Sequence, residues 1–199
     1  MKIAIFGGTF NPIHNGHINL ALKLTERYNF DEMLLIPAKI PPHKSSVGLV
    51  DEEHRLAMCM LAAQKHPVFT VSDIELKRDD TSYSYYTIMQ IKGNYPRAQL
   101  YFIMGCDMLE CFTRWHRYED ILKHVILLAA AREQGEYERM EQLANQLNEI
   151  GGRCIVEHIE PMPISSTEIR NLVAAGGNVS EYVPASIEKY IKANKLYLP

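Results

Sequence analysis

The sequence predicts an open, doubly wound α/β domain with a mostly parallel sheet and helices on both faces. Short apolar runs of strand length alternate with amphipathic segments of helical length along the whole chain. Several of the runs end at glycine or proline, which is typical of buried parallel strands that turn toward a helix. The chain has 199 residues, of which 47% are hydrophobic, enough for one domain with its own core.

The first half of the chain is expected to contribute three strands and three helices. The strands are predicted at residues 2–6, 33–38 and 68–76, the last with an irregular exit. The helices are predicted at residues 16–28, 52–64 and 83–92. Ile18, Ala21 and Leu22 recur at helical spacing in the first of these, and Asp51 is placed to cap the second. Pro37, which precedes it, and Pro41 and Pro42 within it predict that the segment KIPPHKSSVG (39–48) is a loop.

The second half repeats the alternation and then becomes helical. Apolar strands are predicted at residues 98–105, 124–131 and 153–159, and a charged surface helix is predicted at 136–149. Two further helices are expected at about 166–175 and 184–194. We therefore expect one domain over 1–199 in which residues 160–199 form a C-terminal helical subregion. Such Rossmann-like folds bind ligands beyond the carboxyl ends of their strands.

Composition excludes several classes of protein. The net charge of −3 gives no global basic field, so a nucleic-acid partner is not expected. Four cysteines are scattered along the chain without a C-x-x-C pair and are expected to be free thiols. No signal peptide and no membrane span are expected, and the predicted location is the cytoplasm. The sequence does not decide between a monomer and a homo-oligomer.

The stretch GGTFNPIHNGH (7–17) follows the first predicted strand and holds three glycines and two histidines. It has neither the lysine of a P-loop nor the G-x-G-x-x-G pattern. Its glycines nevertheless let an anion approach the backbone, at the point where a helix begins. His14 and His17 could donate to phosphate oxygens or could bind a metal, but no third ligand is evident nearby, and no metal-binding residue is assigned.

A second polar stretch, ISSTEIR (164–170), follows the sixth predicted strand. Ser165 and Glu168 have the spacing of a capping box, so the stretch is expected to open a helix. Three consecutive hydroxyls and Arg170 in the first turn also suit a polyphosphate.

In their order and spacing, these two stretches resemble the paired signatures of the H-x-G-H nucleotidyltransferase superfamily. The whole chain, including the segments PPHK and GCDML, is similar to the bacterial nicotinate mononucleotide adenylyltransferases. The resemblance implies transfer of AMP from ATP, with Mg²⁺, to nicotinate mononucleotide. The products would be nicotinate adenine dinucleotide and pyrophosphate, formed in NAD biosynthesis by direct in-line attack on the α-phosphorus.

The resemblance also implies residue roles. His14, His17, Lys44 and Arg170 would be catalytic. The ATP site would comprise Gly7, Gly8, Thr9, Phe10, His14, Gly16, His17, Gly105, Asp107, Arg132, Ile164, Ser165, Ser166, Thr167 and Arg170. The mononucleotide site would comprise Thr9, Phe10, Asn11, His43, Lys44, Tyr83, Ser84, Thr87 and Trp115, with the indole of Trp115 stacked on the pyridine.

The sequence departs from the family pattern at several positions. Asn11 stands where many relatives carry aspartate, a change that is not expected to alter the reaction class. Tyr86 replaces the usual aspartate, Ser84 replaces threonine, and the family's Arg-Pro-Gly pattern after the fifth strand is altered to Arg-Glu-Gln-Gly (132–135). These last changes leave the choice between the nicotinate and nicotinamide mononucleotides open. A different adenylyltransferase or cytidylyltransferase of the superfamily, or a non-catalytic nucleotide-binding regulator, would also be compatible with parts of the pattern.

Overall fold

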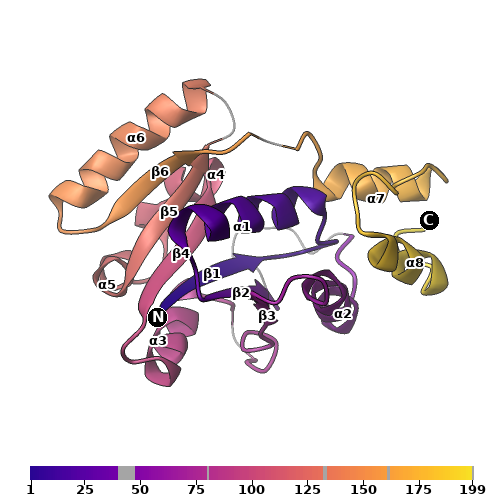
Figure 1. The fold of residues 1–199 in the computed structure, drawn as a ribbon, viewed down its shortest axis with the longest axis horizontal. Helices are drawn as coiled ribbons and strands as arrows, with labels where there is room; N and C mark the ends of the chain where they lie inside the picture. Colours follow the sequence, from indigo (N-terminus) through magenta and orange to yellow (C-terminus); the bar gives the residue numbers. More distant parts are fainter. Residues whose placement is uncertain (40–47, 80, 132–133, 161, 199) are drawn as a thin grey trace.

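A computed structural model describes residues 1–39, 48–79, 81–131, 134–160 and 162–198 (Figure 1). Six parallel strands form one sheet in the order β3-β2-β1-β4-β5-β6, which confirms the doubly wound α/β prediction. The strands are β1 Lys2–Gly8, β2 Glu32–Pro37, β3 Phe69–Val71, β4 Gln99–Gly105, β5 Val125–Ala131 and β6 Cys154–His158.

The third strand is much shorter than predicted. It pairs with β2 only from Phe69 to Val71, and the chain then leaves the sheet. Residues 73–77 instead form a turn, in which the N–H groups of Leu76 and Lys77 donate to the carbonyl of Asp73 at 3.0 and 3.2 Å. The alternating pattern continued past the strand because this turn also buries one side of the chain.

The longer helices lie close to their predicted positions. They are α1 Asn15–Tyr28, α2 Glu52–Ala63, α3 Ser84–Asn94, α6 Gln134–Glu149, α7 Ser166–Ala174 and α8 Ala185–Ala193. Three short helical segments after β4 were not predicted: α4 Cys106–Glu110, the 3-10 turn η1 Phe112–Arg114 and α5 Tyr118–His124. Asp51 occupies the N-cap position of α2, but its side chain makes no capping hydrogen bond.

Two hydrophobic cores cover opposite faces of the sheet. One core joins alternate strand residues such as Ala4 and Leu35 to helices α1, α2, α7 and α8. The other joins Ile5, Phe102 and their neighbours to α3, α4, α5 and α6. This alternation follows from the two-residue repeat of a strand, and it places helices on both faces as predicted.

The ends of β1 and β4 separate at the centre of the sheet. Their pairing extends only to Ile5 and Phe102, whereas β1 continues beside β2 to Gly8 and β4 continues beside β5 to Gly105. The strand order reverses at this point, where α/β sheets bind their ligands. The separation leaves room for a site between the two strands.

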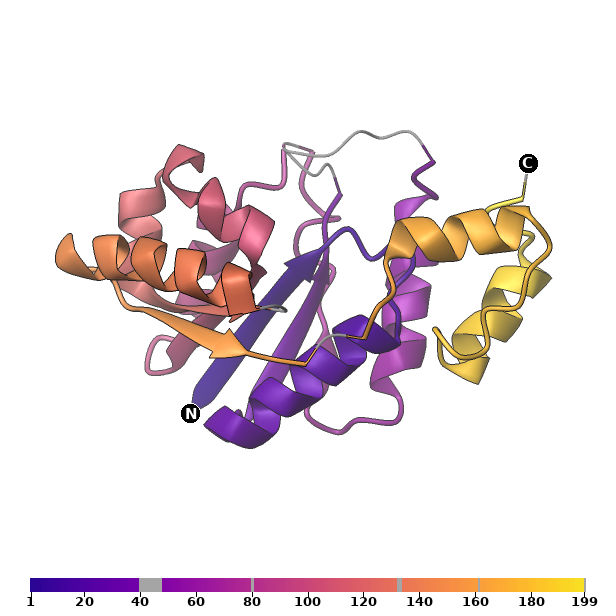
Figure 2. The ribbon, with the colours of Figure 1, turned by 90° about the horizontal axis from the view of Figure 1, so that it is seen from above.

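Helices α7 and α8 lie together at one end of the molecule (Figures 1 and 2). The backbone N–H of Asn15 in α1 donates to the carbonyl of Tyr182, which lies between them, at 2.7 Å. The C-terminal segment therefore contacts the beginning of α1, near the predicted phosphate loop. No helix in the described parts of the chain is long and apolar enough to cross a membrane.

Candidate active site

A cavity of about 330 Å³ lies where β1 and β4 separate. Gly7, Gly8 and Thr9 from the end of β1 form one part of its wall. A Cβ atom added at Gly7 would meet nothing within 4 Å, so the backbone there is open to a ligand. Gly7 therefore leaves main chain open at the switch point, whereas a Cβ atom at Gly8 would meet the ring of Phe10 at 3.0 Å.

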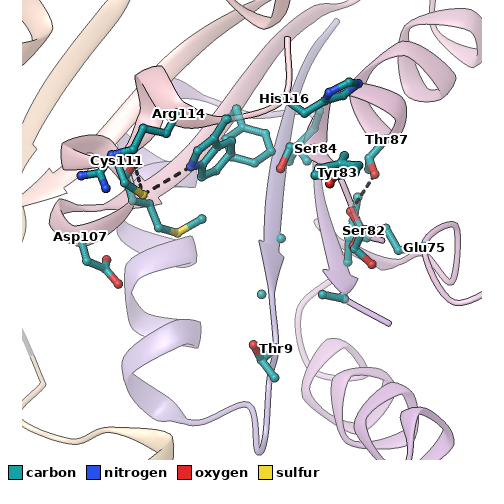
Figure 3. A pocket seen from close by; sticks show the side chains of 18 residues that line it. Thr9, Glu75, Ser82, Tyr83, Ser84, Thr87, Asp107, Cys111, Arg114 and His116 are labelled. Atoms are coloured by element: carbon teal, nitrogen blue, oxygen red, sulfur yellow. Dashed lines mark hydrogen bonds between the residues drawn. The ribbon is translucent and has the colours of Figure 1, made fainter. Parts of the chain in front are cut away.

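Two other walls come from the segments after β4 and around the start of α3. Figure 3 shows Asp107, Cys111 and Arg114 on one side, with Ser82, Tyr83, Ser84, Thr87 and Glu75 on the other. The structure thus brings five residues predicted for the mononucleotide into one cavity: Thr9, Tyr83, Ser84, Thr87 and Trp115. They come from three segments that are distant in sequence.

Trp115 is the largest apolar group of the cavity wall. Its ring packs edge-on against Phe102, with centroids 5.8 Å apart, and lies 5.4 Å from the ring of Phe112. The side chain is only 9% exposed, yet it lines the cavity. This packing fixes the indole as a flat, rigid surface against which a planar ligand could stack.

Sequence reasoning missed Glu75, which also lines the cavity. Its carboxylate is 6% exposed and accepts from the hydroxyl of Thr87 at 2.7 Å. Arg78 Nη2 lies 2.7 Å from the same hydroxyl. Burial raises the pKa of Glu75 above its ordinary value, although the hydrogen bonds from Thr87 and Ser82 and the charge of Arg78 oppose that shift. The sequence placed Glu75 inside the third predicted strand and not after its end, so it was not a candidate for the site.

His116 was also missed, and it lies at the rim of the cavity among three tyrosines. Its ring centroid is 4.8 Å from that of Tyr83, 5.5 Å from Tyr86 and 6.1 Å from Tyr85. Tyr86, which departs from the family pattern, is 42% exposed. Its position next to Trp115 was the one signal in the sequence that could have indicated His116.

His14 and His17 lie together at the start of α1, as the sequence predicted. His14 is the N-cap residue, and the two imidazole centroids are 3.7 Å apart. The backbone N–H of His14 donates to Nδ1 of His17 at 3.3 Å. Because Nδ1 accepts a hydrogen bond, the proton of a neutral His17 lies on Nε2, which is then a donor.

The beginning of α7 lies against the same loop. Ser166 donates from Oγ to the carbonyl of Pro12 at 2.9 Å, and Arg170 donates from Nη1 to the carbonyl of Asn11 at 2.9 Å. A Cβ atom added at Gly16 would lie 3.8 Å from Ile164. The two predicted phosphate-binding stretches are therefore neighbours, although about 150 residues separate them in sequence.

The predicted capping box opens α7. Ser165 Oγ accepts from the backbone N–H of Glu168 at 3.2 Å, and the backbone N–H of Ser165 donates to the Glu168 carboxylate at 2.7 Å. The hydroxyl of Ser165 also donates to this carboxylate, at 2.7 Å, and together with the backbone N–H of Ser165 it holds the pKa of Glu168 below its usual value. The hydroxyl of Thr167 lies 3.2 Å from Nη2 of Arg170. The side chains of Ser165 and Thr167 are exposed at this end of the helix.

Phe10 and Asn11 are more buried than a ligand-binding role suggests. Phe10 is 2% exposed, and its ring packs against those of Phe6 and His17. Asn11 is 5% exposed, and its side-chain amide contacts other segments of the protein. Neither residue lines the cavity, so any contact of Phe10 with a nucleotide would come from its backbone.

Arg55 is a buried cation that no sequence motif indicated. It is 1% exposed and donates to the carbonyls of Thr9 at 2.9 Å, Ala38 at 2.5 Å and Val50 at 3.2 Å. Burial lowers the pKa of its guanidinium. Arg55 thus joins the loop after β1 to the end of β2 and the start of α2. Its spacing from the buried residues Met58, Cys59 and Ala62 was a signal that could have revealed it.

Three predicted site residues, His43, Lys44 and Arg132, lie outside the described residues. Gly105 and Asp107 end β4 and begin α4, and Asp107 lines the cavity. Of the predicted ATP residues, Gly7, Gly8, Thr9 and Asp107 are at the cavity, and Gly105 ends β4 close to Asp107 in sequence. The others that are described lie at the starts of α1 and α7, or in the core near them.

Comparison with known proteins decides the family. A family model described as cytidylyltransferase-like matches residues 5–172. The "Probable nicotinate-nucleotide adenylyltransferase" of Carboxydothermus hydrogenoformans is 40% identical over 98% of this chain and 98% of its own. The chain belongs to the nicotinate-nucleotide adenylyltransferase family. A protein of the same name from Shewanella pealeana is 38% identical over 99% of this chain and 96% of its own.

Solved structures support the fold of this family member. Nicotinic acid mononucleotide adenylyltransferase from Plasmodium falciparum, solved with NaAD, aligns with a TM-score of 0.79 at 19% identity. That alignment covers 98% of this chain and 97% of the other. A putative nicotinate-nucleotide adenylyltransferase from Vibrio parahaemolyticus aligns with a TM-score of 0.70 at 23% identity, over 99% of this chain and 96% of the other. At these identities the likeness concerns the fold.

Proposed function

We propose that this protein transfers the AMP part of ATP to nicotinate mononucleotide, releasing pyrophosphate and forming nicotinate adenine dinucleotide. One observation carries the proposal most directly. The loop after β1 takes part both in the cavity lined by Trp115 and in the contact between the starts of α1 and α7. A planar, ring-bearing acceptor and a polyphosphate donor could therefore meet along one continuous loop.

The donor would be held by groups suited to phosphate. Nε2 of His17 would donate to the α-phosphate, and His14 packs against this ring. The hydroxyls at the start of α7 and the guanidinium of Arg170 would take the β- and γ-phosphates, assisted by the helix N-terminus. Lys44 and Arg132 are proposed to add positive charge.

The acceptor would occupy the cavity. Its pyridine ring would stack on Trp115, and its ribose hydroxyls would be within the reach of polar groups such as Asp107. Two lining residues, Arg114 and His116, can carry positive charge. These positive charges favour the carboxylate of nicotinate mononucleotide over the uncharged carboxamide of nicotinamide mononucleotide.

The proposed chemistry is a direct displacement at phosphorus. The 5′-phosphate of the mononucleotide attacks the α-phosphorus, the bond to the bridging oxygen breaks, and pyrophosphate leaves with that electron pair. The residues at the site offer hydrogen bonds and cations, and their contribution is positioning and stabilisation of the developing charge. No covalent enzyme intermediate is part of the proposal.

ATP would enter as its Mg²⁺ complex. Among the described residues, no group of three or more histidine, cysteine or acidic side chains is arranged to hold a metal. The ion would be held mainly by phosphate oxygens and water, as Mg²⁺ prefers. The exposed carboxylate of Asp107, at the cavity, is the acidic group best placed to approach such an ion.

The proposal is tested by comparing acceptors with the purified protein and MgATP. Initial rates of pyrophosphate release are measured with nicotinate mononucleotide, nicotinamide mononucleotide and phosphopantetheine. We expect kcat/KM to be at least about tenfold higher for the nicotinate form, the value of one favourable charge contact. Equal values would contradict the nicotinate preference, and activity with phosphopantetheine alone would favour another enzyme of the superfamily.

A further inference from the structure

Asn11 joins four segments of the protein. Its Nδ2 donates to the carbonyl of Gly48 at 2.8 Å, and its Oδ1 accepts from the hydroxyl of Tyr197 at 3.0 Å. The backbone N–H of Val50 also approaches Oδ1, at 3.4 Å. The backbone carbonyl of Asn11 accepts from Arg170 at 2.9 Å. A buried amide in these contacts has one defined orientation.

Tyr197 reaches this amide from the segment that follows α8. Its backbone has a φ of 63°, which is unfavourable for a residue with a side chain, and the neighbouring Leu196 is buried in the core. Burial raises the pKa of Tyr197 and outweighs the opposing charges of Arg170 and Arg55. The hydroxyl therefore stays protonated near neutral pH and acts as a donor to Asn11.

The guanidinium of Arg170 lies against Asn11 and against the Gly48 backbone that the Asn11 amide binds. Nη1 donates to the Asn11 carbonyl, and Nη2 lies 3.2 Å from the hydroxyl of Thr167. A Cβ atom added at Gly48 would lie 3.9 Å from Nε of Arg170, so the backbone that Asn11 binds faces the same guanidinium. Loosening the Asn11 amide would therefore loosen the Asn11 carbonyl that accepts from Nη1 and the Gly48 backbone that lies beside Nε, whereas the contact with Thr167 does not depend on Asn11.

We propose that Tyr197 is a positioning residue: its hydroxyl fixes the Asn11 amide, and Asn11 fixes the guanidinium of Arg170 for the polyphosphate of ATP. This inference rests on the proposed function of the site. It gives the C-terminal segment a role in ATP binding, although Tyr197 lies 186 residues from Asn11 in sequence.

The test compares two tyrosine-to-phenylalanine variants. Tyr197→Phe keeps the ring and removes the hydroxyl that contacts Asn11. Tyr190→Phe is the matched control, because the Tyr190 hydroxyl also makes one hydrogen bond from the C-terminal segment, to Nδ1 of His54 at 2.9 Å. Dissociation constants for ATP are measured by calorimetry without acceptor, and kcat/KM for ATP is measured with saturating nicotinate mononucleotide.

We expect Tyr197→Phe to weaken ATP binding and to lower kcat/KM for ATP about fivefold, the typical value of one hydrogen bond. Tyr190→Phe should leave both values within about twofold. Arg170→Lys keeps the charge but loses the planar guanidinium that Asn11 is proposed to position. In this background Tyr197→Phe should therefore change ATP binding less than about twofold, because the guanidinium through which Tyr197 would act is absent.

Unchanged ATP binding in Tyr197→Phe would overturn the inference, and so would an equal loss in the Arg170→Lys background or in Tyr190→Phe. Should Tyr197→Phe fail to fold, Asn11→Ala removes the amide that is proposed to link Tyr197 to Arg170. It is expected to give a loss of ATP affinity that also depends on Arg170. The calorimetry separates this inference from the proposed function, since ATP binding can be lost or kept whether or not nicotinate mononucleotide is the acceptor.

Discussion

The imidazole rings of His14 and His17 lie with their centroids 3.7 Å apart, and the backbone N–H of His14 donates to Nδ1 of His17. This contact serves two purposes. It satisfies one of the N–H groups at the start of α1, and it places the proton of a neutral His17 on Nε2. The same ring therefore begins the helix and presents a donor to the proposed α-phosphate.

His17→Asn separates these two purposes. The Asn amide oxygen can still accept from the backbone N–H of His14, but the variant has no donor at the position of Nε2. We expect kcat to fall by about 10²–10³, the usual cost of one lost donor to transition-state charge, while the melting temperature changes by only a few degrees. Steady-state kinetics and calorimetry check this. Full activity in a folded His17→Asn protein would contradict the role of His17.

Trp115 is predicted to bind the acceptor and not the donor. Trp115→Leu removes the flat surface of the cavity wall and should raise KM for nicotinate mononucleotide about three- to tenfold, with KM for ATP unchanged. Phe30→Leu is the control, since Phe30 is buried in the core on the other face of the sheet and does not line the cavity. The prediction fails if both variants raise KM for the acceptor equally.

Glu75 makes the stability of the protein depend on pH. Its folded-state pKa is raised by burial, so between about pH 4.5 and that raised value the folded state binds more protons than the unfolded state. The free energy of unfolding therefore loses up to about 1.4 kcal/mol per pH unit from this group as pH rises through that window. Glu75→Gln should remove this slope.

The measurement is urea denaturation of the wild type and of Glu75→Gln at several pH values that rise from about 4.5, the ordinary pKa of the carboxyl group. The difference in unfolding free energy between the two proteins should shift in favour of the variant as pH rises. Glu149→Gln, at an exposed position, is the control and should parallel the wild type. A pH-independent difference for Glu75→Gln would contradict the assignment.

Arg55 is predicted to stabilise the loop behind the site. Lysine carries the same charge but cannot reach three carbonyls at once, so Arg55→Lys leaves buried acceptors of Thr9, Ala38 or Val50 unsatisfied. We expect a loss of about 1–3 kcal/mol in the free energy of unfolding. Arg153→Lys, at an exposed position, should change it by less than about 0.5 kcal/mol. Similar losses of unfolding free energy in the two variants would contradict this role of the Arg55 guanidinium.

Much of the fold followed from the sequence because hydrophobic spacing decides long elements. β5, Val125–Ala131, is buried at every residue and was evident as an apolar run. The segment from Cys106 to His124 was not resolved into helices because α4, η1 and α5 are too short to show a helical repeat. β3 was overextended because the buried turn at Ile74 and Glu75 continues the strand's pattern.

The candidate site, too, could be predicted from the sequence only where a local motif marks it. Local motifs predicted that His14 and His17 share a helix start, and that Ser165 and Glu168 form a capping box. Contacts between distant segments gave no local signal: nothing near Tyr197 indicates that its hydroxyl meets Asn11. For Arg55, the helical spacing to Met58, Cys59 and Ala62 could have indicated burial, but its carbonyl partners could not be predicted because a carbonyl exists at every position of a chain.

The central claim is that AMP moves intact from ATP to the mononucleotide. Parallel reactions with [α-³²P]ATP and [γ-³²P]ATP, each with nicotinate mononucleotide, test it most directly. We predict that the α-label appears in a dinucleotide with the mass of nicotinate adenine dinucleotide, and that the γ-label appears in pyrophosphate in equal amount. Release of the γ-label as orthophosphate, or an α-label that never joins the mononucleotide, would contradict the account.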